Sequence, residues 1–216
     1  MRYRKLASLL LIAGNVFAQS APPEFIADSK TGCKIGRPGG VEPNDPVSWS
    51  GGCKNGLADG RGILQAGKPD SAVRFEGVCR AGLATGKGIF VYANGARYEG
   101  EFRNGDFDGK GSLQMVDGST YVGDFKNDEM NGTGVRKYAN GSIFMGQFKD
   151  GQLNGKGGAF VGGDSYEGDF KAHKPDGIGV ATIEGKTYSG SWVKGCLRKG
   201  ELKVNFVATR KECGFN

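Results

Sequence analysis

The side chains best suited to covalent chemistry in this sequence are five cysteines: Cys33, Cys53, Cys79, Cys196 and Cys213. No two of them have the C-x-x-C spacing of a zinc knuckle or a redox pair. In an exported protein such cysteines form disulfides, and an odd number leaves one thiol free or bonded to another molecule. We therefore expect structural disulfides rather than a metal site.

Other candidates for catalysis are few. The single histidine, His173, lies in the turn-like segment KAHKPDG, and no serine elbow, HExxH motif or cysteine partner accompanies it. The tripeptide GKG at 86–88, 109–111 and 155–157 resembles part of a phosphate loop, but it lacks the spacing and the following helix of that loop. We predict a protein that is not an enzyme and that needs no cofactor.

The first residues have the pattern of an export signal. Three basic residues precede a 13-residue apolar run over 6–18, which ends in the small residues Val16 and Ala18 expected before a cleavage site. A membrane-spanning helix needs about 20 apolar residues. We predict a signal peptide over 1–18 and a periplasmic or secreted protein of bacterial type. A retained membrane anchor and a buried core segment are the alternatives.

The net charge does not indicate a nucleic-acid partner. The whole chain has a formal charge of +6, but without Arg2, Arg4 and Lys5 of the leader it has 26 basic and 23 acidic residues, a charge of +3. Nucleic-acid binding favours a concentrated basic face. The remaining charge is too small and too dispersed for that class.

A short motif recurs seven times, and the structure that these repeats form must hold the other features of the chain in place. It consists of an aromatic residue (the first ring), a glycine two residues later (the repeat glycine) and a second ring or a cysteine after two more residues. The spacing of 22–26 residues is typical of a stacked repeat array. The first rings are Trp49, Phe75, Tyr98, Tyr121, Phe144, Tyr166 and Tyr188.

Each repeat is expected to form a β-hairpin. Alternate residues of a strand share a face, so the two rings and the repeat glycine lie together. Glycine weakens a strand, and its recurrence implies that a ring of a neighbouring strand lies over it. Asn-Gly and Asp-Gly pairs supply the turns, whereas glycines this frequent would cost a helix about 1 kcal/mol each. We predict an all-β fold whose rings form the core.

The segment YEGEFRNGDFDGKGSLQMVDGSTYVG over 98–123 resembles the repeat of the MORN family (membrane occupation and recognition nexus). The resemblance extends from Trp49 to Leu197 and departs from the family pattern where Cys53 and Cys79 replace second rings. It implies an elongated single-layer antiparallel sheet of about seven consecutive hairpins. We expect this array over 47–197, an irregular N-terminal extension or cap over 19–46, and a C-terminal strand and cap over 198–216.

The sheet implied by the resemblance restricts the disulfides. Cys53 and Cys79 would occupy equivalent positions one hairpin apart, at about 10 Å, whereas a disulfide needs Cα atoms within about 7 Å. We therefore expect Cys33 to bond one of these two cysteines and Cys196 to bond Cys213, so that both caps are covalently attached.

Basic residues recur at fixed places in the repeat and are candidates for contacts to a partner or to lipid. They follow the second ring or lie between paired glycines: Arg80, Arg103, Lys126, Lys149 and Lys171, and Lys87, Lys110 and Lys156. One interpretation is a solvated face with cross-strand ion pairs, and the other is a ladder that meets an acidic partner or anionic lipid. We expect a non-catalytic protein-interaction scaffold; a peripheral membrane module is the alternative, and self-association through the array ends is a further mode.

Overall fold

A computed structural model describes residues 24–215, and the predicted signal peptide over 1–18 lies outside the described residues. The strands belong to one open sheet, antiparallel throughout except for a single parallel bridge. The prediction of an all-β sheet of consecutive hairpins is confirmed. The chain divides into two compact units, which are described separately: unit 1 extends to residue 116 and includes 125–128, and unit 2 contains 117–124 and all residues from 129.

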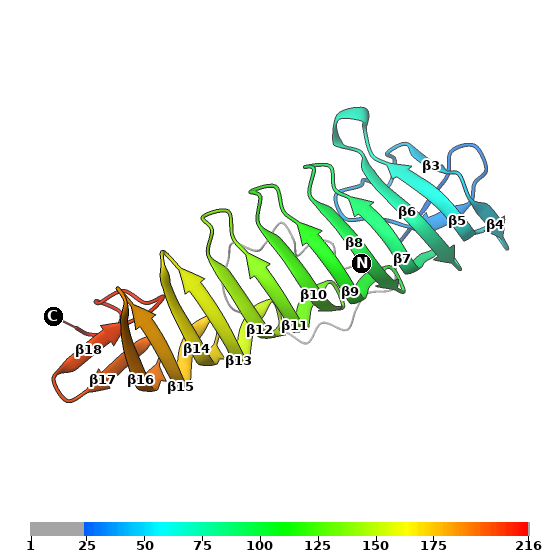
Figure 1. The fold of residues 1–216 in the computed structure, drawn as a ribbon. Helices are drawn as coiled ribbons and strands as arrows, with labels where there is room; N and C mark the ends of the chain where they lie inside the picture. The colour runs from blue at the N-terminus through cyan, green and yellow to red at the C-terminus, as the bar shows by residue number, and fades with distance from the viewer. Residues whose placement is uncertain (1–23, 216) are drawn as a thin grey trace. The chain divides into compact units, whose positions relative to one another are not determined.

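Unit 1 begins with short strands and continues into hairpins (Figure 1). From β4 to β9 each strand pairs antiparallel with the next. The elements are β1 (Phe25–Ala27), β2 (Lys34–Gly36), β3 (Val47–Trp49), β4 (Gly52–Lys54), β5 (Leu57–Ala66), the 3-10 turn η2 (Pro69–Ser71), β6 (Val73–Arg80), β7 (Leu83–Val91), β8 (Arg97–Arg103) and β9 (Asp106–Gln114).

Unit 2 consists of hairpins up to the C-terminal segment. Strand β10 (Thr120–Lys126) contributes residues 120–124 to unit 2 and its last two residues to unit 1. From β11 to β18 each strand again pairs antiparallel with the next. These strands are β11 (Glu129–Lys137), β12 (Ile143–Lys149), β13 (Gln152–Val161), β14 (Asp164–Lys171), β15 (Lys174–Ile183), β16 (Lys186–Val193), β17 (Cys196–Lys199) and β18 (Leu202–Asn205).

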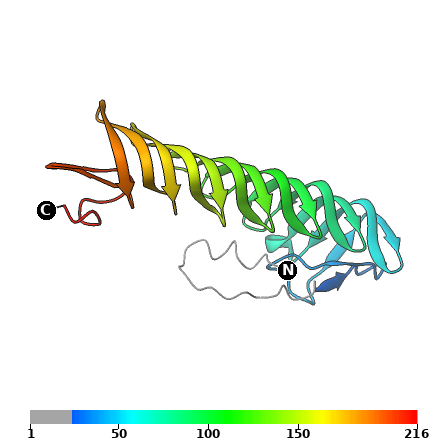
Figure 2. The ribbon, with the colours of Figure 1, turned by 90° about the horizontal axis from the view of Figure 1, so that it is seen from below.

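The N-terminal segment of unit 1 lies beside the hairpin turns, as Figure 2 shows in blue. The amides of Lys34 and Gly36 donate to the turn carbonyls of Gly56 (2.9 Å) and Gly82 (2.8 Å). The buried Asp28 carboxylate accepts four hydrogen bonds, among them one from the backbone amide of Trp49 at 2.9 Å. These bonds, with those from Thr31 the largest cause, lower the Asp28 pKa to about 2.

The hairpins close through tight turns with two consecutive residues at positive φ, which is the requirement of a type I′ turn. Asn104 and Gly105, for example, have φ of 53° and 91°. The second turn residue also donates its amide to a carbonyl of the preceding hairpin: Gly105 to Ala84 at 2.9 Å in unit 1, and Gly151 to Met130 at 3.0 Å in unit 2. This backbone ladder joins successive hairpins within each unit on their turn side.

The first rings pack directly on bare backbone. A Cβ atom added at Gly100 or at Gly111 would lie 2.5 Å from Tyr98, which is completely buried. The Tyr98 hydroxyl then donates to the Glu101 carbonyl at 2.9 Å. The expectation for the repeat glycine needs a correction: Gly100 is covered by the ring of its own strand, and a neighbouring strand's ring covers the facing Gly111. One ring therefore spans both strands of a hairpin.

Two first rings of unit 2 repeat this arrangement, whereas Gly146 and Gly190 are not covered by a ring. Tyr121 lies over Gly123 and Gly134, and its hydroxyl donates to the Asp124 carbonyl at 3.1 Å. Tyr166 covers its own glycine pair in the same way and donates to the Asp169 carbonyl at 3.2 Å. The prediction that the rings form the core is confirmed except at Tyr188, which is half-buried, and these second rings are all buried: Phe102, Phe125, Phe148, Phe170 and Trp192.

This packing generates a stability test on two glycines of unit 2. A Cβ atom at Gly179 would lie 2.1 Å from the Tyr166 hydroxyl, whereas one at Gly158 would meet nothing closer than 3.5 Å. We expect Gly179→Ala to destabilise the protein by about 1–3 kcal/mol, as overpacking does. The matched control Gly158→Ala should change stability by less than about 0.5 kcal/mol. Urea unfolding followed by tryptophan fluorescence measures both, and equal losses would contradict the ring-on-glycine core.

Candidate interaction surface

The eight basic residues singled out in the sequence are all exposed. Those that follow a second ring position are the last residues of their strands: Arg80 of β6, Arg103 of β8, Lys126 of β10, Lys149 of β12 and Lys171 of β14. This regular placement is a consequence of the hairpin repeat. Whether they contact a partner or lipid stays a prediction.

Acidic residues lie next to several of these cations. Arg103 pairs with Asp108 at 3.0 Å in unit 1, and Lys156 pairs with Asp169 at 2.7 Å in unit 2. Lys87 lies directly opposite Glu101 in the register of β7 and β8. The basic columns are therefore interleaved with acids, which reduces the field that a row of cations would otherwise produce.

A cluster of apolar side chains lies on the face of unit 2 opposite to the rings, which we name the outer face. Val135 and Met145 are direct cross-strand partners, and Ile143 is opposite Phe160 on the adjoining pair of strands. Phe160, Val135 and Met145 are 51%, 45% and 36% exposed. The outer patch is defined as Val122, Val135, Ile143, Met145 and Phe160.

The outer face of unit 1 has a different chemistry at the same positions of the repeat. The residues that flank the first ring there are Arg74 and Glu76 in β6, and Arg97 and Glu99 in β8. Each pair forms an ion pair at 2.6 Å. In β12 the equivalent residues are Ile143 and Met145. Comparison of these flanking positions between repeats would have revealed Val122, Ile143 and Met145 of the outer patch from the sequence, whereas attention to the rings and cations missed them.

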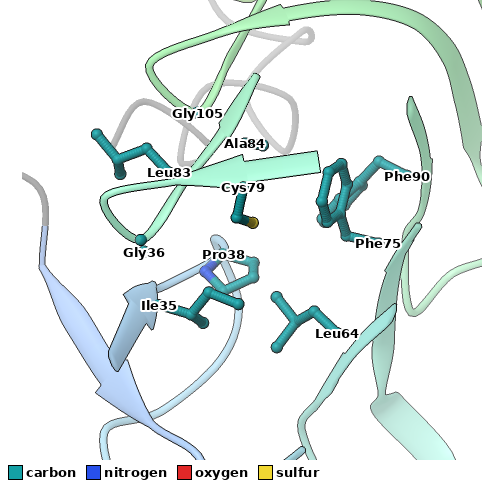
Figure 3. A pocket seen from close by; sticks show the side chains of 11 residues that line it. Ile35, Gly36, Pro38, Leu64, Phe75, Cys79, Leu83, Ala84, Phe90 and Gly105 are labelled. Carbon is teal, nitrogen blue, oxygen red and sulfur yellow. The ribbon is translucent and has the colours of Figure 1, made fainter. Parts of the chain in front are cut away.

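The expected Cys196–Cys213 disulfide is present, and Cys33 bonds Cys53, one of the two partners that the sequence had left open; the Cα–Cα distances are 5.6 and 5.9 Å. Cys79 is a free, buried thiol. It faces a cavity of about 30 Å³ in unit 1 that is lined mainly by apolar side chains, including those of Ile35, Leu64, Phe75 and Phe90 (Figure 3). Burial raises the Cys79 pKa to about 12. This environment gives the thiol no reactivity as a nucleophile.

His173 has a structural place in a turn of unit 2. Its φ is 64°, and its Nδ1 accepts the backbone amide of Leu153 at 3.3 Å. The ring also packs edge-on against Phe144 and Phe148, with centroid distances of 5.6 and 6.3 Å. Burial, followed by the positive charge of Arg136, lowers the His173 pKa to about 4. The histidine is therefore neutral at neutral pH.

The described part of the chain, residues 24–215, contains no group of three or more histidine, cysteine or acidic side chains arranged to hold a metal ion. Within that same range no helix is long and apolar enough to cross a membrane.

Comparison with known proteins gives one family. A family model described as MORN repeat matches five segments, residues 75–97, 98–120, 121–143, 144–158 and 166–183. The matches span 75–183 and coincide with the regular hairpins from β6 to β15. No curated protein matches the chain.

The burial of Cys79 leads to a modification test. We expect iodoacetamide to leave the native protein unmodified and to add one carbamidomethyl group once denaturant exposes the thiol, because the buried thiol does not ionise at neutral pH. Intact mass spectrometry measures both states. Non-reducing peptide mapping should recover the Cys33–Cys53 and Cys196–Cys213 bridges, and rapid labelling of the native protein or a Cys53–Cys79 bridge would contradict this assignment.

The low pKa of His173 predicts a pH dependence of stability. Between about pH 6.5 and pH 4 the unfolded chain binds a proton at this histidine and the folded chain does not, so the free energy of unfolding should fall as the pH is lowered through that window. His173→Gly, which restores the residue found at the equivalent turn position Gly151, should remove this component. Urea midpoints measured from pH 7 to pH 4.5 test it, and parallel curves for the two proteins would refute it.

Proposed function

The chain belongs to the MORN-repeat family, whose repeats mediate protein or membrane interactions, and on that premise we propose that it is a non-catalytic module that binds a protein partner through the outer patch. The observation that carries this proposal is the exposed apolar cluster formed by Val135, Met145 and Phe160. Contiguous apolar side chains on a soluble surface are typical of interaction sites.

The rings on the other face make this surface available. Because the first and second rings already form the core, side chains of the outer face contribute little to packing. Apolar residues there are not needed for the fold, since Arg74 and Glu76 occupy equivalent positions in unit 1. Met145 itself lies where other repeats have Glu76, Glu99 or Glu167. A function in binding accounts for the apolar residues.

A peripheral membrane module is the weaker alternative. It would rely on the basic columns, in which Arg103 and Lys156 are paired with acids. Exposed ion pairs of this kind reduce the attraction to anionic head groups. Apolar contacts at the centre of a patch with charged residues around it are the usual pattern of a protein interface.

Export is part of the proposal. Two disulfides fit an oxidising compartment, and the sequence of residues 1–18 supplies the pattern of a signal peptide. We propose a periplasmic or secreted location, where a partner would meet the mature protein.

Substitution of Met145 tests the proposed surface. Met145→Glu introduces a residue that this position of the repeat already accommodates at Glu99, so the melting temperature should remain within about 2 °C. We expect retention of a partner from envelope extract to fall at least about tenfold, because a charge would be buried in the interface. Glu99→Gln, on the outer face of unit 1, is the matched control and should retain the partner.

Three results would contradict the proposal. Equal capture by the wild-type protein and Met145→Glu would remove the outer patch from the interface. Flotation of the protein with vesicles of anionic lipid, lost on Lys149→Gln or Lys171→Gln, would favour the membrane alternative. A dimer in sedimentation analysis that dissociates on Met145→Glu would identify the occupant as a second copy of the chain.

A further inference from the structure

Arg136 is a charged residue in an otherwise apolar column of the ring face. This column consists of the second-strand residues that lie opposite a first ring, as Arg136 lies opposite Phe144. Five of its six members are apolar, and all six are buried. They are Leu64, Phe90, Leu113, Arg136, Ala159 and Ala181. The packing of the repeat does not explain why an arginine occupies a position at which the other repeats have leucine, phenylalanine or alanine.

The guanidinium of Arg136 is held by aromatic neighbours. Its Cζ lies 4.4 Å from the centroid of the Tyr138 ring, an arrangement of the cation–π type. Phe144 packs edge-on against Tyr138, with centroids 5.6 Å apart, and against His173 at the same distance. His173 is neutral at neutral pH, so none of these three rings compensates the charge of the cation.

The Nε–H group of Arg136 also lacks a hydrogen-bonding partner. The residue is only 9% exposed, its buried Nε has no acceptor, and within residues 24–215 the guanidinium forms no ion pair. Asp117 is near enough for Arg136 to contribute to the lowering of its pKa, but the main cause is the hydrogen bond from the Ser119 amide, which its carboxylate accepts at 2.8 Å. A buried cation with an unsatisfied donor is unfavourable for stability.

We propose that Arg136 binds the carboxylate of an aspartate or glutamate from an extended segment of a partner protein laid along the ring face of β11 and β12. A guanidinium presents two parallel N–H donors that match the two oxygens of a carboxylate. Tyr138 and Phe144 exclude water from the pair, which strengthens the hydrogen bonds. One cation with no second basic group in the column fits a singly charged carboxylate better than a phosphate dianion.

This subsite is separate from the outer patch because alternate residues of β11 point to opposite faces. Val135 belongs to the outer patch, and Arg136 belongs to the ring face. Binding at one face can therefore be removed without the other, and failure of either proposal leaves the other standing.

A peptide selection tests the carboxylate subsite. A displayed library of random 12-residue peptides would be selected on the wild-type protein, on Arg136→Leu and on Lys137→Leu, the last being the matched control for loss of a positive charge from the same strand. We expect the wild-type and Lys137→Leu pools to be enriched in aspartate or glutamate at one position and the Arg136→Leu pool to lack this enrichment. Equal acid content in all pools, or no binding peptide on the wild-type protein, would overturn the proposal.

Affinities of the selected peptides provide the quantitative test. Arg136→Leu should weaken binding about 10- to 100-fold, the range of a lost charge-assisted hydrogen bond. Conversion of the peptide's acid to its amide should weaken binding to the wild-type protein equally and should have no further effect on Arg136→Leu. The affinity of Arg136→Lys should be intermediate, since lysine keeps the positive charge but lacks the two parallel N–H donors of the guanidinium. An amide effect that is the same on both proteins would overturn the pairing.

Stability separates recognition from a structural role. Arg136→Leu introduces the residue type of Leu113, so we expect a melting temperature equal to or above that of the wild-type protein. A fall of several degrees would assign Arg136 a structural role, for example through a pair with Asp117 in solution, and would overturn the proposal. Asp117→Asn identifies that outcome, since it would then lower the melting temperature as well.

Discussion

An aromatic ring lying on the bare backbone of two facing strands is the interaction on which this protein depends. Tyr98 covers Gly100 and Gly111, and its hydroxyl bonds the Glu101 carbonyl, so one side chain fastens both strands of a hairpin. The same arrangement recurs with Tyr121 and Tyr166 in unit 2. Because ring and glycine lie on one face, each hairpin obtains a core without a second layer of structure.

Because the ring face provides the core, the residue types of the outer face can vary between repeats. Arg74 and Glu76 in unit 1 form an ion pair where Ile143 and Met145 in unit 2 form part of an apolar patch. Both sets are compatible with the same hairpin, because neither packs in the core. On the ring face the constraint is stricter, and a charged residue such as Arg136 stands out against it. We therefore expect partners to bind at two kinds of position. The first are outer-face residues, which vary without changing the fold, and the second are ring-face residues such as Arg136, whose burial is unfavourable for stability.

The ends of the repeat region are held by other means. In unit 1 the Cys33–Cys53 bridge and the buried Asp28 carboxylate attach the N-terminal segment to the first hairpins. In unit 2 the Cys196–Cys213 bridge attaches the residues that follow β18. A stacked sheet exposes unpaired strand edges at its ends, and terminal segments protect them. The two disulfides thus attach the terminal segments covalently to the hairpins at the ends of the repeat region.

The sequence by itself determined the hairpin repeat and its ring core, since spacing fixes which residues share a face, whereas the choice of Cys53 over Cys79 as the partner of Cys33 came from the structure. The sequence could not tell which ring covers which glycine. A ring two residues away on the same strand and a ring on the neighbouring strand are equally compatible with the pattern. Only the tertiary structure showed that the buried Nε of Arg136 has no hydrogen-bond acceptor and that Val135 and Phe160 belong to one exposed patch. Both facts depend on register between strands and on solvent exposure, which arise when the hairpins pack.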